Sequence, residues 1–107
     1  MPTPEQFENV TARTHANLYF DGRVVSHTIL LQDGSKKTLG VMFPGRYEFD
    51  TAAAERMDIT VGACKVELPG ESSARTIEAG SSFDVPANSR FVIEIAGTPC
   101  QYVCSYL

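Results

Sequence analysis

Three carboxylates lie close together near the middle of the chain, at Glu48, Asp50 and Glu55. Because side chains two positions apart on a strand point to the same side, Glu48 and Asp50 share one face. Glu55 begins the next alternating run with the parity of Met57 and Ile59, which predicts an inward position. A half-buried carboxylate among apolar groups could bind a pair of sugar hydroxyls or exchange a proton with a substrate. A solvated charge at a strand end is the alternative for Glu55 and our interpretation for the other two.

The histidines and cysteines offer little for a metal site or a nucleophile. His15 and His27 are twelve positions apart and form no His-x-His unit. On a strand, Cys100 and Cys104 would be roughly 13 Å apart, too far to share a zinc ion with Zn–S bonds of about 2.3 Å. Cys104 also lacks the cationic neighbour that would make it a thiolate. We interpret the cysteines as small buried apolar side chains.

Positive charges are few and scattered. Arg46, Arg75 and Arg90 are candidate ligands for an anion, as are Lys36 and Lys37, although a solvated charge is the usual explanation for two lysines beside a turn. The 107 residues hold nine Lys and Arg against thirteen Asp and Glu, a net charge of -4. Since a nucleic-acid polymer needs a basic face to offset its phosphates, this balance argues against such a partner and against an anionic membrane. A local pocket for one small anion stays possible.

Period-2 alternation predicts strands as the scaffold for these groups. Inward and outward positions alternate over 57–61, 64–68, 91–95 and 102–106, and turn dipeptides such as Asp33-Gly34 separate the runs. We count roughly nine short strands at a spacing of roughly 8–12 residues, which predicts an all-β sandwich or barrel. Residues 1–16 are polar, and we expect an N-terminal extension with little fixed structure or a short helix from Pro4. Residues 17–107 form the predicted domain.

Composition indicates one small domain in a reducing compartment. The hydrophobic fraction is 43% and the charged fraction 21%, which fits a folded chain. No basic segment followed by an apolar run marks a secretory signal, and no apolar stretch approaches the ~20 residues of a membrane span. Three cysteines are an odd number, unlike a secreted disulfide scaffold. We expect a cytoplasmic protein.

Two spaced motifs resemble those of the cupins, which are small double-stranded β-helix barrels with a jelly-roll-like fold. Glu55-x6-Gly62 and Gly80-x5-Pro86 have the spacing of the first and second motifs. The usual metal-binding histidines are absent, because the matching positions fall near Glu48 and Asp50 and on Phe91. One carboxylate facing an aromatic ring is a poor transition-metal site, so we expect a cupin without a metal.

A closer resemblance covers residues 17–107. The ordered strings are Tyr19-Phe20-Asp21-Gly22, Thr38-Leu39-Gly40-Val41-Met42, Pro44-Gly45-x-Tyr47-x-Phe49, Glu55-x-Met57, Leu68-Pro69-Gly70, Phe83-x-Val85-Pro86, Ser89-x-Phe91 and Tyr102-x-Cys104-x-Tyr106. Together they resemble the cupin-fold pyrimidine/purine nucleoside phosphorylases. Arg46 and Arg75 depart from the family pattern, which has an acidic residue and commonly an aromatic residue there.

The resemblance implies metal-independent phosphorolysis of purine and pyrimidine nucleosides to a free base and ribose 1-phosphate, with a broad substrate range. Inorganic phosphate is then the co-substrate, and no cofactor is expected. Such a reaction needs donors for phosphate, an acceptor for ribose hydroxyls and an aromatic face for the base. For ribose we assign Glu55, and for phosphate we assign Ser89 and Thr38. The assigned substrate-binding residues are Tyr47, Phe49, Met57, Phe91, Tyr102 and Tyr106.

Other interpretations stay open from the sequence. Each named aromatic residue could equally pack in the core. A non-catalytic cupin that binds a sugar-like ligand is the main alternative function, and a degenerate metal cupin using Glu48, Asp50 and Glu55 is a third. Cupins commonly pair through strands, so we predict a homodimer. Tyr47 and Phe49 compete with Glu48 and Asp50 for the inward face, and we favour the aromatic pair because two buried carboxylates would be costly.

Overall fold

The computed structural model describes residues 3–107, in which eleven strands and no helix occur. The strands are β1 (Thr11–Ala12), β2 (Asn17–Tyr19), β3 (Val24–Leu30), β4 (Lys36–Met42), β5 (Gly45–Asp50), β6 (Glu55–Val61), β7 (Ala63–Glu67), β8 (Arg75–Glu78), β9 (Ser82–Val85), β10 (Arg90–Ile95) and β11 (Cys100–Tyr106).

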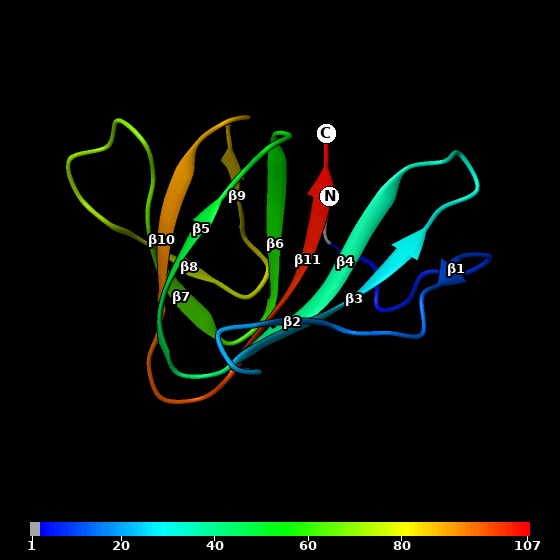
Figure 1. Cartoon of the computed structure of the whole chain (residues 1–107). Helices are drawn as coiled ribbons and strands as arrows, with labels where there is room; N and C mark the ends of the chain where they lie inside the picture. Colours follow the sequence, from blue (N-terminus) through cyan, green and yellow to red (C-terminus); the bar gives the residue numbers. More distant parts are fainter. Residues whose placement is uncertain (1–2) are drawn as a thin grey trace.

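The strands form two antiparallel sheets. The larger sheet has the order β1-β3-β4-β11-β6-β9 with β2 paired to β3, and the smaller one has the order β5-β10-β7-β8. In Figure 1 the smaller sheet lies at the left, β6 and β11 lie centrally, and β3 and β4 lie at the right. The all-β cupin class predicted from the sequence is confirmed. The prediction of about nine strands falls short because β1 and β2 span only two and three residues, too few to produce an alternating pattern.

The core follows the predicted alternation. On β10, Phe91, Ile93 and Ile95 are buried while Arg90 and Glu94 are exposed. On β5, Tyr47 is buried and Phe49 half-buried, whereas Glu48 and Asp50 are exposed, so the aromatic pair takes the inward face as we favoured. Because inward side chains from both sheets meet, the apolar core lies between the sheets.

The N-terminal segment is extended. Between Thr3 and Ala16 its only regular element is β1, which pairs with β3 through Thr11 and Ala12. The short helix considered from Pro4 is therefore wrong, which fits the sparse apolar periodicity of this polar stretch. Met1 and Pro2, which the extension prediction includes, lie outside the described residues. No helix in residues 3–107 is long and apolar enough to cross a membrane.

Candidate functional site

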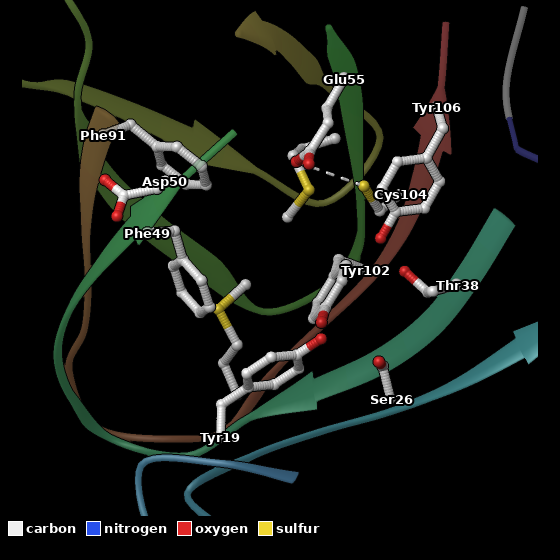
Figure 2. A pocket seen from close by; sticks show the side chains of 12 residues that line it. Tyr19, Ser26, Thr38, Phe49, Asp50, Glu55, Phe91, Tyr102, Cys104 and Tyr106 are labelled. Atoms are coloured by element: carbon white, nitrogen blue, oxygen red, sulfur yellow. Dashed lines mark hydrogen bonds between the residues drawn. The ribbon is translucent and has the colours of Figure 1, made fainter. Parts of the chain in front are cut away.

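One cavity opens among the inward faces of both sheets, has a volume of about 130 Å³ and is partly open to solvent. Its lining residues are Tyr19, Ser26, Thr38, Met42, Phe49, Asp50, Glu55, Met57, Phe91, Tyr102, Cys104 and Tyr106. Figure 2 shows them around a common space, with aromatic rings on one side and hydroxyl groups on the other.

Aromatic rings form the first side of the cavity. Phe49 of β5 and Phe91 of β10 are stacked, with ring centroids 5.6 Å apart and planes at 22°. Tyr19 meets Phe49 edge-on at 6.0 Å. Phe20 and Phe83 pack edge-on against Phe49 and Phe91 at 5.3 and 6.0 Å, which holds the two rings in place. This side offers flat apolar surface with few directional hydrogen-bond groups.

Hydroxyl groups of Ser26, Thr38, Tyr102 and Tyr106 form the second side, which we call the hydroxyl cluster. They come from β3, β4 and β11, which are neighbours in the larger sheet. Ser26 and Thr38 are buried, at 2% and 5% exposure. Asn17 of β2 donates from Nδ2 to Ser26 Oγ at 3.1 Å and so fixes this hydroxyl.

The position of Tyr102 depends on a glycine. Gly40 on β4 pairs with Tyr102 on β11 and with Ser26 on β3. A Cβ at Gly40 would lie 2.5 Å from Tyr102 Oη, so only glycine lets the ring lie across β4. The Tyr102 hydroxyl therefore reaches Ser26, and this contact opposes the larger effect of burial, which raises the pKa of Tyr102. Tyr102 is a neutral phenol at physiological pH.

Glu55 lies between the two sides, at the start of β6. Cys104 Sγ donates to Glu55 Oε1 at 3.5 Å. Partial burial raises the pKa of Glu55, while the Cys104 hydrogen bond and the Lys36 charge oppose that rise. Burial, together with the Glu55 charge, raises the pKa of Cys104 to about 12, so this sulfur is a thiol and a poor nucleophile at neutral pH. Glu55 is thus the ionisable carboxylate closest to both sides.

A surface ion-pair cluster lies at the aromatic end of the cavity. Arg90 Nε donates to Asp50 Oδ1 at 2.9 Å, and Arg90 Nη1 lies 3.2 Å from Glu48 Oε1. Arg46 and Arg75, the departures from the family pattern, make surface pairs with Glu67 and Glu71. Within residues 3–107, no group of three His, Cys, Asp or Glu side chains is placed to hold a metal ion. The three cysteines are free and buried.

Seven of the nine residues assigned from the sequence line the cavity, namely Thr38, Phe49, Glu55, Met57, Phe91, Tyr102 and Tyr106. Tyr47 does not line it, because its ring is buried in the core and its hydroxyl donates to Phe43 O at 2.6 Å. Ser89 also lies outside, where its hydroxyl donates to Ala87 O at 3.2 Å and its N–H to Thr51 Oγ1 at 2.9 Å. Both side chains are engaged by the loops beside their strands.

Five lining residues were not assigned from the sequence: Tyr19, Ser26, Met42, Asp50 and Cys104. Strand parity carries a signal for two of them, because Ser26 matches buried Val24, and Cys104 matches Tyr102 and Tyr106. Asp50 faces outward by parity and reaches the cavity only because it ends β5. Tyr19 is 43% exposed and enters the site through the pairing of β2 with β3.

Comparison with known sequences gives a consistent result. The model of the family described as "Pyrimidine/purine nucleoside phosphorylase" matches residues 14–106. A protein of that name from Aromatoleum aromaticum is 51% identical over 106 residues, which cover 99% of each chain. The relative therefore also aligns with nearly all of residues 1–16, the segment predicted as an extension.

Comparison with solved structures supports the fold. A protein of unknown function from Acinetobacter sp. ADP1 superposes with a TM-score of 0.92 at 41% identity, covering 95% of this chain and 98% of that one. A cupin-like protein from Thermotoga maritima superposes with a TM-score of 0.63 at 17% identity, covering 78% and 67% of the two chains. The second similarity concerns the fold alone.

Proposed function

This chain belongs to the pyrimidine/purine nucleoside phosphorylase family, and we propose that it cleaves both purine and pyrimidine nucleosides with inorganic phosphate and without a metal ion. The observation that carries the proposal is the two-sided cavity, which has aromatic rings at one end, hydroxyl groups at the other and Glu55 between them. These are the three kinds of group that a base, a phosphate and a ribose require.

In the proposed reaction a phosphate oxygen attacks C1′ of the ribose. The C1′–O bond forms as the C1′–N bond breaks, and the bonding electron pair leaves with the base. The released base gains one proton, balanced by the one that hydrogen phosphate loses, and the products are free base and ribose 1-phosphate. Since positive charge develops on the ribose in the transition state, the Glu55 carboxylate would stabilise it and accept ribose hydroxyl hydrogen bonds.

The aromatic end supports a broad substrate range. Phe49 and Phe91 present stacked rings rather than a set of directional donors and acceptors. Every nucleobase has a flat π-face, so stacking accepts purines and pyrimidines alike. A site that hydrogen-bonded one base edge would instead reject the others strongly. We therefore place the base at this end, with Met57 as an adaptable apolar wall.

The charges around the cavity support chemistry without a metal. Glu48 and Asp50, which fall near the metal-ligand positions of the cupin motif, are already paired with Arg90. Glu55 has a thiol rather than a second carboxylate or an imidazole as its neighbour. A hard divalent cation prefers several oxygen ligands, and a transition metal prefers imidazole or thiolate. Metal-independent phosphorolysis is the proposal that fits this donor set.

We also propose a homodimer formed through the outward face of the larger sheet. A row of outward residues crosses five paired strands from Leu18 through Val25, Val41 and Gln101 to Val61. Leu18 and Val61, at the two ends of this row, are 66% and 47% exposed, and Val25 and Val41 lie between them, so the face is unusually apolar for an exposed surface. A second copy would cover this face.

Three buried free thiols also agree with the cytoplasmic location we propose.

The direct test is a base-release assay with inosine and uridine, each with and without phosphate. We expect phosphate-dependent release of both bases and formation of ribose 1-phosphate. EDTA treatment, with metal removal checked by metal analysis, should leave the rate of base release unchanged. Absence of release from either nucleoside would contradict the proposed range, and a rate restored only by added metal would contradict metal independence. A melting temperature raised by nucleosides without turnover would instead favour a non-catalytic binding protein, which the family match does not favour.

A further inference from the structure

The hydroxyl cluster lies opposite the aromatic rings, and we propose that its four hydroxyl groups, with Lys36 at their rim, form the phosphate subsite of the reaction proposed above. The inference rests on that proposed function and adds to it a place for the anion and an orientation for the nucleoside. It also assigns Ser26 and Tyr102, which the sequence did not suggest for phosphate, and selects Lys36 from the five candidate anion ligands of the sequence.

Convergence of the side chains is the first argument. Ser26, Thr38 and Tyr102 lie on three paired strands, with Ser26 and Tyr102 both opposite Gly40. In Figure 2 the hydroxyls of Thr38 and Tyr106 point toward one another, and that of Tyr102 points toward Ser26 and Tyr19. Hydroxyl donors on one concave surface can each bind a different oxygen of a tetrahedral anion. Neutral donors of this kind hold an anion without a buried countercharge.

Donor availability is the second argument. Asn17 Nδ2 donates to both Ser26 Oγ at 3.1 Å and Thr28 Oγ1 at 3.1 Å. Since Ser26 Oγ accepts this bond, it keeps its own proton to donate to the neighbouring Tyr102 hydroxyl or to an anion in the cavity. Burial raises the pKa of both Tyr102 and Tyr106, which keeps each phenol protonated and able to donate. The second side of the cavity therefore offers donors, as an anion requires.

Lys36 supplies the positive charge. Its Nζ lies 4.3 Å from the centroid of the Tyr106 ring, at the end of β4 that carries Thr38. Lys36 has the parity of Thr38, and the Tyr106 ring beneath its ammonium group lines the cavity. Its charge also acts on Glu55. In the sequence Lys36 is a candidate anion ligand, although its position beside a turn favours a solvated charge. A lysine at this rim would draw phosphate inward in spite of the net charge of -4.

The other end of the cavity is unsuited to phosphate. Arg90 is its nearest cation, but Asp50 and Glu48 already neutralise that charge and would repel a dianion. With phosphate on the hydroxyl cluster, C1′ faces that cluster, the ribose lies beside Glu55, and the base points to Phe49 and Phe91. One orientation thus satisfies all three parts of the substrates.

Steady-state kinetics with inosine and varied phosphate test the subsite in Thr38→Val and Tyr106→Phe. Loss of one donor to a charged ligand should raise the KM for phosphate by about tenfold to a hundredfold. The KM for inosine should change by less than about twofold, because the inosine contacts lie at the other end. Thr76→Val, the same change at an exposed position of β8, is the matched control and should behave as wild type. Thr38→Ser, which keeps the hydroxyl, should restore phosphate affinity.

Binding of inorganic phosphate without nucleoside is the second measurement. Phosphate should raise the melting temperature of the wild type and of Thr76→Val, but not of Thr38→Val or Lys36→Met. Folded Thr38→Val and Tyr106→Phe enzymes with an unchanged phosphate KM would overturn the subsite, as would a large phosphate effect of Arg90→Met. A wild type that binds phosphate through Thr38 yet releases no base would contradict the proposed function while supporting the subsite.

Discussion

At the residue scale, Glu55 has the most constrained surroundings of the candidate groups. It is half-buried, has the Cys104 thiol as its hydrogen-bond donor at 3.5 Å, and has no arginine among the groups that shift its pKa. Partial burial without a strong ion pair destabilises the carboxylate form. Glu55 in its charged form therefore lowers the stability of the folded chain, a cost that is common for functional groups.

That cost has a pH signature. Burial raises the pKa of Glu55, so the native state holds this proton more tightly than the unfolded state. As pH rises from below the ordinary glutamate pKa to above the raised one, the wild-type free energy of unfolding should fall relative to that of Glu55→Gln. Above this window the difference should be constant. Denaturant titrations of both proteins between pH 4 and pH 8, at intervals of about half a unit, measure this difference in the free energy of unfolding. The other carboxylates titrate in both proteins, so their contributions cancel in the difference.

The same variant separates a ligand role from a structural one. Gln keeps the volume of Glu55 but loses its charge, so turnover should fall by about a hundredfold in an otherwise folded protein. Full activity in Glu55→Gln would show that the carboxylate is structural. A pH dependence of stability identical in the two proteins would contradict the assignment of an elevated pKa.

Single residues differ in how well the sequence revealed them. Parity placed Glu55 and Phe91 inward because each belongs to a clear alternating run, and the cost of burying two carboxylates placed Phe49 inward. Ser26 was not assigned because a serine gives no apolar signal of its own, so that only its parity with Val24 indicates its face. Ser89 was assigned to phosphate from its parity with Phe91, whereas the loop bond from Ser89 N to Thr51 Oγ1 could not be seen without the fold. Short polar side chains thus need the three-dimensional register before they can be placed.

At the scale of elements, the pairing of β3, β4 and β11 builds the second side of the cavity. Their register brings Ser26, Gly40 and Tyr102 into one row. Alternation predicts each strand but not its partners, and on β11 Cys104 pairs with Thr38 of β4 and Met57 of β6, which are 66 and 47 positions away along the chain. The row that orients Tyr102 therefore could not be predicted from the sequence, although Gly40 and Tyr102 both lie in the sequence strings that resemble the family.

Gly40→Ala should disturb this row. The added Cβ would lie 2.5 Å from Tyr102 Oη, so the ring must leave the backbone of β4. Overpacking of this kind destabilises a fold by about 1–3 kcal/mol, and phosphate-dependent turnover should fall with it. Calorimetric melting and a crystal structure of the variant would measure the loss and the ring position.

A double variant provides the control for Gly40→Ala. Tyr102→Leu removes the ring that the new methyl group meets, so adding Gly40→Ala to Tyr102→Leu should cost much less stability than Gly40→Ala alone. Additive effects of the two changes would show that the glycine is required for another reason. A Gly40→Ala protein as stable as wild type, with Tyr102 unmoved, would contradict the close approach itself.

At the scale of the whole molecule, the two faces of the larger sheet have different surroundings. The inward face lines the cavity, and the outward face carries the exposed row from Leu18 to Val61. Thr3–Phe7 lie along part of that outward face, beside Leu39 and Val103. A small domain with such a surface gains stability by covering it. Since Lys36 and Thr38 belong to the same strand as Leu39, a dimer would also stiffen the strand that carries part of the phosphate subsite.

Leu39→Glu is expected to convert the dimer to a monomer. Leu39 is 37% exposed on the outward face, beside Val103 on the paired strand, and a carboxylate there would be buried without a partner in a dimer. Light scattering coupled to gel filtration at about 10 µM should give twice the 11.7 kDa chain mass for wild type and about that mass for the variant. Thr76→Glu, a charge added on the opposite sheet, should remain dimeric. A monomeric wild type would contradict the proposed dimer. A dimeric Leu39→Glu beside a dissociated Thr76→Glu would show that the interface lies on another face.

If the dimer stiffens β4, the monomeric variant should also show a raised KM for phosphate with an almost unchanged KM for inosine, because only the hydroxyl end of the cavity is built on that strand.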